Sequence, residues 1–318
     1  MTNLKTSYLG LELKNPLIVG ASSLTANPEK LSKFESAGAI VFKSLFEEQI
    51  QIEEMEMMNS MDEYAERNAE MISLFPNIKH AGPKEHLLKL KKAKENINIP
   101  VIASLNAMHN DTWVEYAKQI EQTGVDAIEL NFFITPRNFE KTGSDIIQSQ
   151  IDVLNLVSKK INIPIAVKLS PFYTNPLSVI NRMDIERVGG FVLFNKLFQP
   201  DIDIDKESLK QSIVLSNSND VRLAIRFAGL LYGNINADIA SSGGILTSDD
   251  AIKTILAGAS SFQVVSTLYK NGPDFIETIL SDISAWMTEK GYSQIMGLTP
   301  WAWGLVAASL AGVAAAVA

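Results

Sequence analysis

The sequence predicts a (β/α)₈ barrel, and three observations carry that prediction. Short apolar runs alternate about eight times with stretches of helical pattern. The runs are apolar nearly throughout, as expected for parallel strands that are covered on both faces. The chain has 318 residues, 46% of them hydrophobic, which is enough for one barrel with a large core. An open, doubly wound sheet is the second interpretation.

Each predicted strand ends in small or polar residues. The first six strands are expected at residues 16–20, 39–42, 100–104, 126–130, 164–167 and 190–194, and the last two lie within 238–247 and 261–269. The helices between them are expected at residues 28–37, 84–95, 113–122, 144–160 and 177–187, with a further helix opening at Thr247 and a last one at 272–290.

Two stretches are too long for ordinary barrel turns. Residues 47–77, after the second strand, are acidic and rich in methionine, and residues 199–219 follow the sixth strand. Long loops in compact domains are often functional, so we interpret both as excursions from the barrel, the first as a candidate lid. We assign residues 1–298 to the barrel domain. Residues 299–318 form an apolar C-terminal tail that we leave outside it.

Composition excludes several classes of function. The net charge of −8 argues against nucleic acid as the main partner. The chain has no cysteine, so it cannot offer a thiolate nucleophile or a cysteine-ligated metal. Its three histidines, His80, His86 and His109, share no ligand spacing, and we expect no metal site. The first residues lack an apolar signal core, so we expect a cytoplasmic protein without a membrane partner.

The ends of the last two strands predict an anion site. Gly243 and Gly244 follow strand seven, and Ser266 and Thr267 follow strand eight. Glycines let backbone amides approach an anion, and a helix start adds partial positive charge. Phosphate sites of (β/α)₈ barrels are often built after strands seven and eight. Two ordinary strand-to-helix turns are the alternative interpretation.

The other strand ends place further polar residues at the same mouth of the barrel. They are Ala21 and Ser22, Lys43, Ser104 to Asn106, Asn131, Lys168 and Asn195. A lysine after an apolar strand must reach water, a carboxylate or a bound anion. Period-two alternation puts Glu129 and Asn131 on one face of strand four, and Lys168 could pair with Glu129 from the next strand. A purely structural ion pair at the mouth is the competing interpretation.

A lysine-and-amide rim beside a phosphate site suits a ligand with a phosphate tail and a planar, amide-like head. FMN is such a ligand, and a lysine near its pyrimidine ring would stabilise the negative charge that builds there on reduction. Schiff-base aldolases also use barrel lysines and supply the rival enzyme class.

The ordered motifs resemble the dihydroorotate dehydrogenase family, most closely its soluble class, over roughly residues 4 to 296. They are Asn15-Pro16, Ala21-Ser22, Lys43-Ser44, Glu129-Leu130-Asn131, residues 167–171, Phe194-Asn195, residues 241–251 and residues 258–273. The resemblance implies an FMN-dependent enzyme of pyrimidine biosynthesis. The residues it implies for FMN binding are Ala21, Ser22, Lys43, Asn106, Asn131, Lys168, Gly243, Gly244, Ser266 and Thr267. For the substrate it implies Lys43, Asn131 and Asn195.

The substrate half departs from the family pattern. Family members carry a cysteine or serine base in the loop after the Glu-Leu-Asn motif, where this chain has Thr135 before Pro136. Residues 72–77 replace the family's substrate loop, and residues 221–226 replace a glycine-rich loop after strand six. The pattern resembles the dihydroorotate dehydrogenase-like subgroup. Thr135 and Lys168 are the candidate catalytic residues, and threonine is a poor base unless a neighbour takes its proton.

We therefore predict an FMN-dependent oxidoreductase that oxidises dihydroorotate or a related small cyclic molecule, and we expect a homodimer. An FMN-dependent reductase of another substrate, a non-catalytic flavin- or nucleotide-binding barrel and a Schiff-base lyase are the alternatives. The sequence leaves the electron acceptor open.

Overall fold

The computed structural model describes residues 2–47, 83–107, 109–132, 138–186, 188–196, 201–210 and 215–298. Three features predicted from the sequence lie outside these ranges. They are nearly all of the excursion after the second predicted strand, the C-terminal tail and Thr135.

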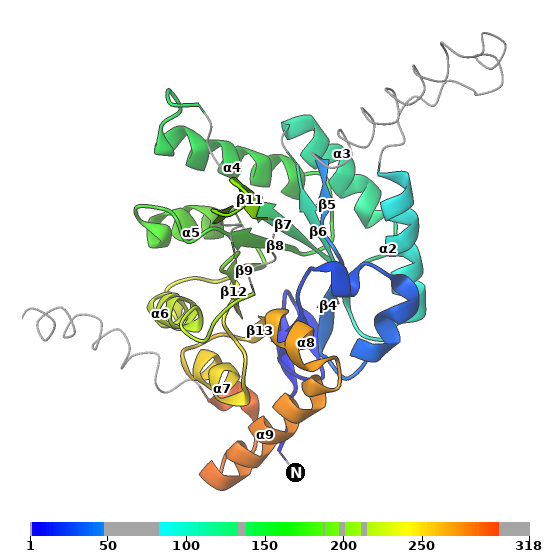
Figure 1. The fold of residues 1–318 in the computed structure, drawn as a ribbon, viewed down its shortest axis with the longest axis vertical. Helices are drawn as coiled ribbons and strands as arrows, with labels where there is room; N and C mark the ends of the chain where they lie inside the picture. Colours follow the sequence, from blue (N-terminus) through cyan, green and yellow to red (C-terminus); the bar gives the residue numbers. More distant parts are fainter. Residues whose placement is uncertain are drawn as a thin grey trace, which may run out of the picture.

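Eight parallel strand positions close into a barrel, which confirms the predicted (β/α)₈ fold (Figure 1). In ring order the strands are β3 (Leu17–Val19), β4 (Ala39–Val41), β6 (Val101–Asn106), β7 (Ala127–Phe132), β8 (Ile165–Leu169), β9 (Gly190–Leu193), β12 (Asp238–Ser242) and β13 (Ser261–Val264). The pairing of β4 with β6 closes the ring, and the short strand β5 (Leu45–Phe46) pairs with the far end of β6. All residues of β6, β7 and β8 are buried, as their continuous apolar runs predict.

Helices follow the strands and surround the barrel (Figure 1). They are α2 (Lys84–Asn96), α3 (Asn110–Glu121), α4 (Gly143–Ser158), α5 (Pro176–Ile185), α6 (Val221–Leu231), α7 (Ser248–Leu256), α8 (Ser266–Asn271) and α9 (Phe275–Lys290). The first connection differs from the prediction, because η2 (Pro28–Phe34) is a 3₁₀-helix. Such tight turns are common in short connectors, and Pro28 with the capping side chain of Asn27 starts this one.

An N-terminal hairpin closes the bottom of the barrel. Strands β1 (Thr6–Tyr8) and β2 (Leu11–Leu13) pair antiparallel, and Tyr8 and Leu9 are buried. A Cβ on Gly190 of β9 would lie 2.8 Å from Leu9 Cδ2 and 3.0 Å from Tyr8 Cε2, so the hairpin packs closely against β9 only because residue 190 is glycine. Asp238 accepts a hydrogen bond from the Leu9 amide at 2.8 Å, which fixes the hairpin to β12.

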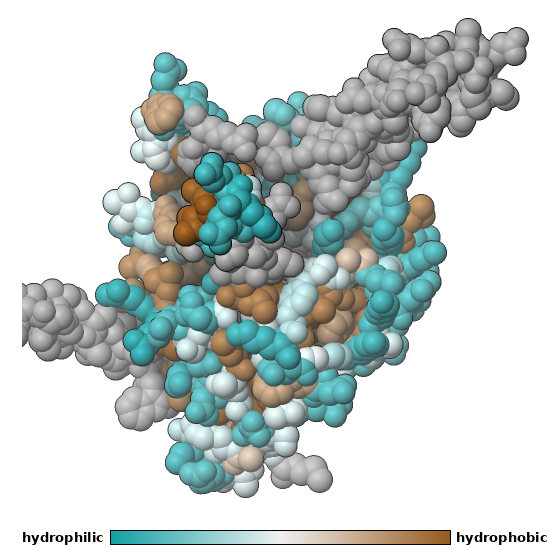
Figure 2. Space-filling view, in the orientation of Figure 1, coloured by the Kyte–Doolittle hydropathy of each residue, from teal (hydrophilic) through white to brown (hydrophobic). Residues whose placement is uncertain are grey.

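The excursion after β9 contains a second hairpin, β10 (Asp201–Asp203) and β11 (Ser208–Lys210). Residues 221–226, interpreted from the sequence as a replacement for a loop, instead form the first turns of α6. Hydrophobic residues gather toward the middle of the face in Figure 2, and hydrophilic residues dominate much of its lower and right-hand rim.

Two kinds of feature are absent from the described ranges. No helix among these residues is long and apolar enough to span a membrane. Within the same ranges, no group of three or more His, Cys, Asp or Glu side chains is placed to hold a metal ion.

Candidate functional site

The turn after β12 is held in a defined shape by its neighbours. Gly243 and Gly244 have φ angles of +93° and +71°, a region that favours glycine. Thr247 and Asp250 form a capping box at the start of α7. The Asp250 carboxylate also accepts from the Leu246 amide at 3.1 Å. Neither glycine amide donates to another described residue, so both remain available to a ligand.

The end of β13 is tied to this turn. Thr267 is fully buried, and its hydroxyl donates to the Leu246 carbonyl at 3.0 Å. The Ser266 hydroxyl accepts from the Ser216 amide at 2.9 Å, which draws in the segment that precedes α6. The two strand ends predicted to form one anion site are therefore joined by a direct hydrogen bond. The Thr267 hydroxyl is engaged there, so contact with an anion would come through its backbone.

Lys168 lies in a buried polar cluster across three strands. Its Nζ donates to Gln263 Oε1 at 3.0 Å and lies 3.5 Å from Glu129 Oε1. Gln263 Nε2 donates to Glu129 Oε2 at 2.6 Å. The Glu129–Lys168 pair predicted from strand alternation is confirmed. Gln263 was not predicted, although a glutamine inside the apolar run Phe262 to Val265 was the available signal.

Three amide side chains form a second polar cluster at the mouth. Asn195 Nδ2 donates to Asn131 Oδ1 at 2.6 Å, and Asn106 Nδ2 donates to the Asn131 carbonyl at 2.8 Å. These bonds orient Asn131, which is buried, and leave the side-chain oxygen of Asn195 and both Nδ2 hydrogens of Asn131 for other partners. The strand ends thus gather Asn106, Asn131 and Asn195 as predicted.

Lys43 lies beside a half-buried histidine, His86. It forms no ion pair with another residue in the described ranges and is half-buried. His86 of α2 packs edge-to-face on Phe42, with ring centroids 5.5 Å apart. Burial, and then the charges of Lys43 and Lys89, lower the pKa of His86 to about 4. His86 is therefore neutral at pH 7 and adds no charge beside Lys43.

A cavity of about 400 Å³ opens at the carboxyl ends of β3, β8, β9, β12 and β13. Seven of the predicted residues line it: Ala21, Ser22, Lys168, Asn195, Gly243, Gly244 and Ser266. The described residues Lys43, Asn106, Asn131 and Thr267 do not. Gln263, Tyr269 and Lys196 also line it and were not predicted.

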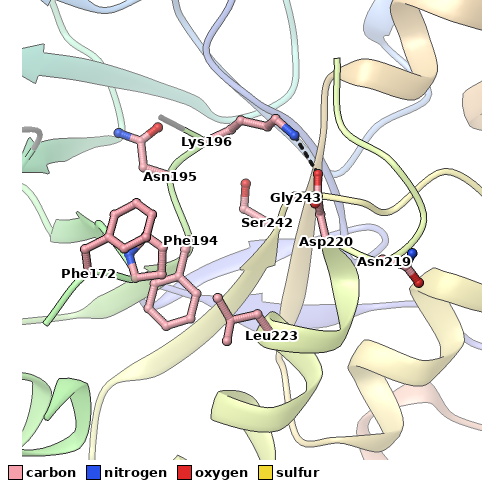
Figure 3. Close-up of a pocket in the computed structure, with 10 residues that line it drawn as sticks. Phe172, Phe194, Asn195, Lys196, Asn219, Asp220, Leu223, Ser242 and Gly243 are labelled. Atoms are coloured by element: carbon pink, nitrogen blue, oxygen red, sulfur yellow. Dashed lines mark hydrogen bonds and ion pairs between the residues drawn. The ribbon is translucent and has the colours of Figure 1, made fainter. Parts of the chain in front are cut away.

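A second hollow of about 280 Å³ shares Phe194, Asn195, Lys196, Ser242 and Gly243 with this cavity. Figure 3 shows Phe172, Phe194 and Leu223 gathered on one side of it and the Lys196–Asp220 ion pair on the other. That pair is 2.6 Å long. Burial raises the pKa of Asp220, but the hydrogen bonds from Lys196 and Asn217 outweigh it and lower the pKa overall.

The model of the dihydroorotate dehydrogenase family matches residues 3–287, nearly the whole barrel. The chain belongs to the dihydroorotate dehydrogenase family. Among its relatives is the dihydroorotate dehydrogenase B (NAD(+)) catalytic subunit of Methanocaldococcus jannaschii, 26% identical over 93% of this chain and 97% of that protein. The proteins of the same name from Thermoplasma volcanium and Methanosarcina mazei are each 28% identical, over 93% of this chain and 97% and 95% of theirs.

Family membership confirms the resemblance seen in the ordered motifs. In this dihydroorotate dehydrogenase family member, most of the residues carrying those motifs lie toward the carboxyl ends of the barrel strands, whereas Asn15-Pro16 precedes β3 at the opposite end. The individual roles of the predicted residues stay predictions, and Thr135 lies in residues 133–137, outside the described ranges.

Proposed function

We propose that this protein is an FMN-dependent oxidoreductase that oxidises dihydroorotate or a closely related small cyclic substrate. The observation that carries the proposal is the single cavity that joins a two-glycine turn to the ammonium of Lys168. A flavin mononucleotide needs both an anion cradle and a positive charge near its ring. Family membership supports a flavin in general, and this arrangement supports FMN in particular.

The phosphate end of the cavity fits the donors that a phosphate needs. The amides of Gly243 and Gly244 are unused by other described residues, and the glycines adopt the positive φ that such a turn requires. Ser22 lines the same cavity, and its hydroxyl donates no hydrogen bond to another described residue. These three donors, with Ser266, would hold the phosphate and ribityl part of FMN.

The ring end is served by Lys168. When bound, FMN would supply the hydride-accepting chemistry. Lys168 would hold positive charge beside the part of the ring that becomes negative, and the paired amides of Asn131 and Asn195 would orient an imide-like substrate ring. Thr135 remains the candidate base that would accept the proton from the substrate's carbon. Lys43 remains a candidate for binding the substrate's carboxylate.

The contacts of Lys168 Nζ with both Glu129 and Gln263 argue against the Schiff-base lyase alternative. A Schiff-base lysine needs a free amine. The relatives' designation as catalytic subunits suggests that this chain also works within a multisubunit assembly. A homodimer of this chain and a cytoplasmic location stay predictions.

Heat denaturation of the purified protein tests the cofactor directly. We expect one released chromophore that co-elutes with FMN, and non-covalent rebinding of FMN to the stripped protein. Ser22→Ala should weaken FMN binding roughly tenfold, the effect of about one lost hydrogen bond to a charged group. Ser32→Ala, an exposed serine on η2, is the matched control and should bind like the wild type. Release of FAD, or failure to take up FMN, would overturn the proposal.

A further inference from the structure

Glu129, Gln263 and Lys168 come from three different strands, β7, β13 and β8, and meet inside the barrel. Their exposed fractions are 1%, 2% and 8%. Lys168 and Gln263 line the cavity, whereas Glu129 lies behind them. The cluster is therefore a buried ion pair, bridged by an amide, at the inner wall of the cavity.

The Gln263 amide can satisfy this cluster in only one orientation. The Lys168 ammonium only donates, and an ionised Glu129 only accepts. Gln263 must therefore turn its oxygen to Lys168 and its nitrogen to Glu129, as observed. A Cβ on Gly20 would lie 2.8 Å from Val265 Cγ2 and 3.3 Å from Gln263 Oε1, so glycine leaves the space that this amide occupies. Glu129 thus orients the group that holds Lys168.

Glu129 also carries a charge that water does not screen. Its Oε1 accepts no hydrogen bond, and Lys168 is its only ion-pair partner among the described residues. On the other side, burial and then the charges of Glu129 and Asp238 raise the pKa of Tyr8. The negative charge of Glu129 therefore acts on another buried group of the barrel interior, Tyr8, because charges interact strongly where water is excluded.

We propose that Glu129 is a positioning residue that holds the Lys168 ammonium through Gln263, offsets part of its charge and so sets the reduction potential of the bound flavin. This inference rests on the proposed function, because it requires FMN in the cavity. It assigns Lys168 and Glu129 opposite effects. Lys168 favours the reduced flavin, and Glu129 limits that effect.

The sign of the potential shift tests the proposal. Glu129→Gln keeps an acceptor for Gln263 but removes the charge, so reduced FMN should bind about tenfold more tightly relative to oxidised FMN, a rise of about 30 mV for two electrons. Lys168→Met should shift the potential the opposite way. The double variant should lie between the two single variants, because it removes both charges. Asp126→Asn is the control, since its ion pair with Lys94 lies at the other end of β7, and it should keep the wild-type potential.

The outcomes separate this inference from the proposed function. A wild-type protein that binds no FMN overturns both. The second outcome is that FMN binds, but Glu129→Gln shifts its reduction potential in the same direction as Lys168→Met or leaves it unchanged. That result overturns the inference alone, because Glu129 would then serve only as an anchor. Glu129→Ala removes the same charge without placing a second amide beside Gln263, and it should make FMN easier to reduce. It provides the same test of sign if Glu129→Gln does not fold, and an unchanged potential would overturn the inference.

Discussion

Gly243 and Gly244 are adjacent and both have positive φ, yet the structure constrains them differently. A Cβ on Gly243 would meet no atom closer than the Phe194 carbonyl oxygen at 4.0 Å. A Cβ on Gly244 would lie 2.3 Å from the Val221 amide nitrogen and 2.8 Å from the Asn217 carbonyl oxygen. Gly243 thus leaves room toward the cavity, whereas Gly244 allows the start of α6 to pack on the turn.

Alanine substitutions should separate these two roles. Gly244→Ala should lower the free energy of unfolding by at least about 2 kcal/mol, since it adds a backbone clash to an unfavourable φ. Gly243→Ala should cost roughly 1 kcal/mol, the conformational part alone. Gly124→Ala is the control, with φ of +82° and nothing within 4 Å of a Cβ. Urea unfolding measures all three, and equal losses for Gly244 and Gly124 would contradict the packing role.

Residue-level prediction succeeded where a local rule applied. Strand alternation was enough to pair Glu129 with Lys168, because adjacent parallel strands bring such positions together. The same rule could not find Gln263, which lies 95 residues from Lys168 in sequence and reaches it across the barrel. The Lys196–Asp220 ion pair was not predicted for a similar reason, because it depends on how the excursion after β9 folds back.

At the scale of elements, the hydrophobic pattern predicted strands better than helices. Residues 221–226 stand where the family has a glycine-rich loop, yet they begin α6, in which Val221, Ala224 and Ala228 recur at helical spacing and are buried. The N-terminal hairpin was missed because Tyr8 and Leu13 gain their burial from the barrel floor. The hairpin therefore depends on tertiary contacts that no local pattern specifies.

The Thr267–Leu246 hydrogen bond joins the turns after β12 and β13, so breaking it should loosen both. Thr267→Val keeps the shape of the buried side chain but removes the donor to the Leu246 carbonyl. We expect a loss of about 1–3 kcal/mol in unfolding free energy, from the unsatisfied carbonyl, and weaker FMN binding. Thr254→Val, whose buried hydroxyl donates to Ala251 within α7, is the control and should leave FMN affinity unchanged. Thr267→Ser should restore most of the binding.

The packing of α2 on the barrel should make stability sensitive to acid. The unfolded chain protonates His86 near pH 6.5, whereas the folded protein does so only at about 4. Stability is therefore greatest above pH 6.5 and falls as the pH drops toward 4, by up to about 3 kcal/mol. His86→Phe should remove most of this dependence, and His109→Asn, at an exposed histidine, should not. An unchanged pH profile in His86→Phe would contradict the burial of a neutral imidazole.

At the scale of the whole molecule, the barrel supplies the proposed cofactor cavity, while the departures from the family pattern concern the substrate. The fold and the gathering of the strand ends followed from the order of apolar runs, since parallel strands in a barrel end at a common mouth. The substrate side is expected to depend on residues 72–77 and Thr135, whose sequences differ from the family's and which lie outside the described ranges. No local sequence rule predicts the conformation of these two segments.

This division predicts slow oxidation of dihydroorotate by a protein that binds FMN well. The reaction removes a proton from carbon as well as a hydride, and a positioned general base typically contributes ~10²–10⁴-fold. A threonine hydroxyl without an identified partner should supply little of that, so Thr135→Ala and Thr135→Ser should change kcat by less than about tenfold. The assay follows dihydroorotate oxidation with fumarate, quinone and dye acceptors, with FMN content measured for each variant. Brisk wild-type turnover abolished by Thr135→Ala would contradict this expectation and make Thr135 the base. Slow turnover that neither substitution alters, with FMN still bound, would direct the search to another cyclic substrate for the same cavity.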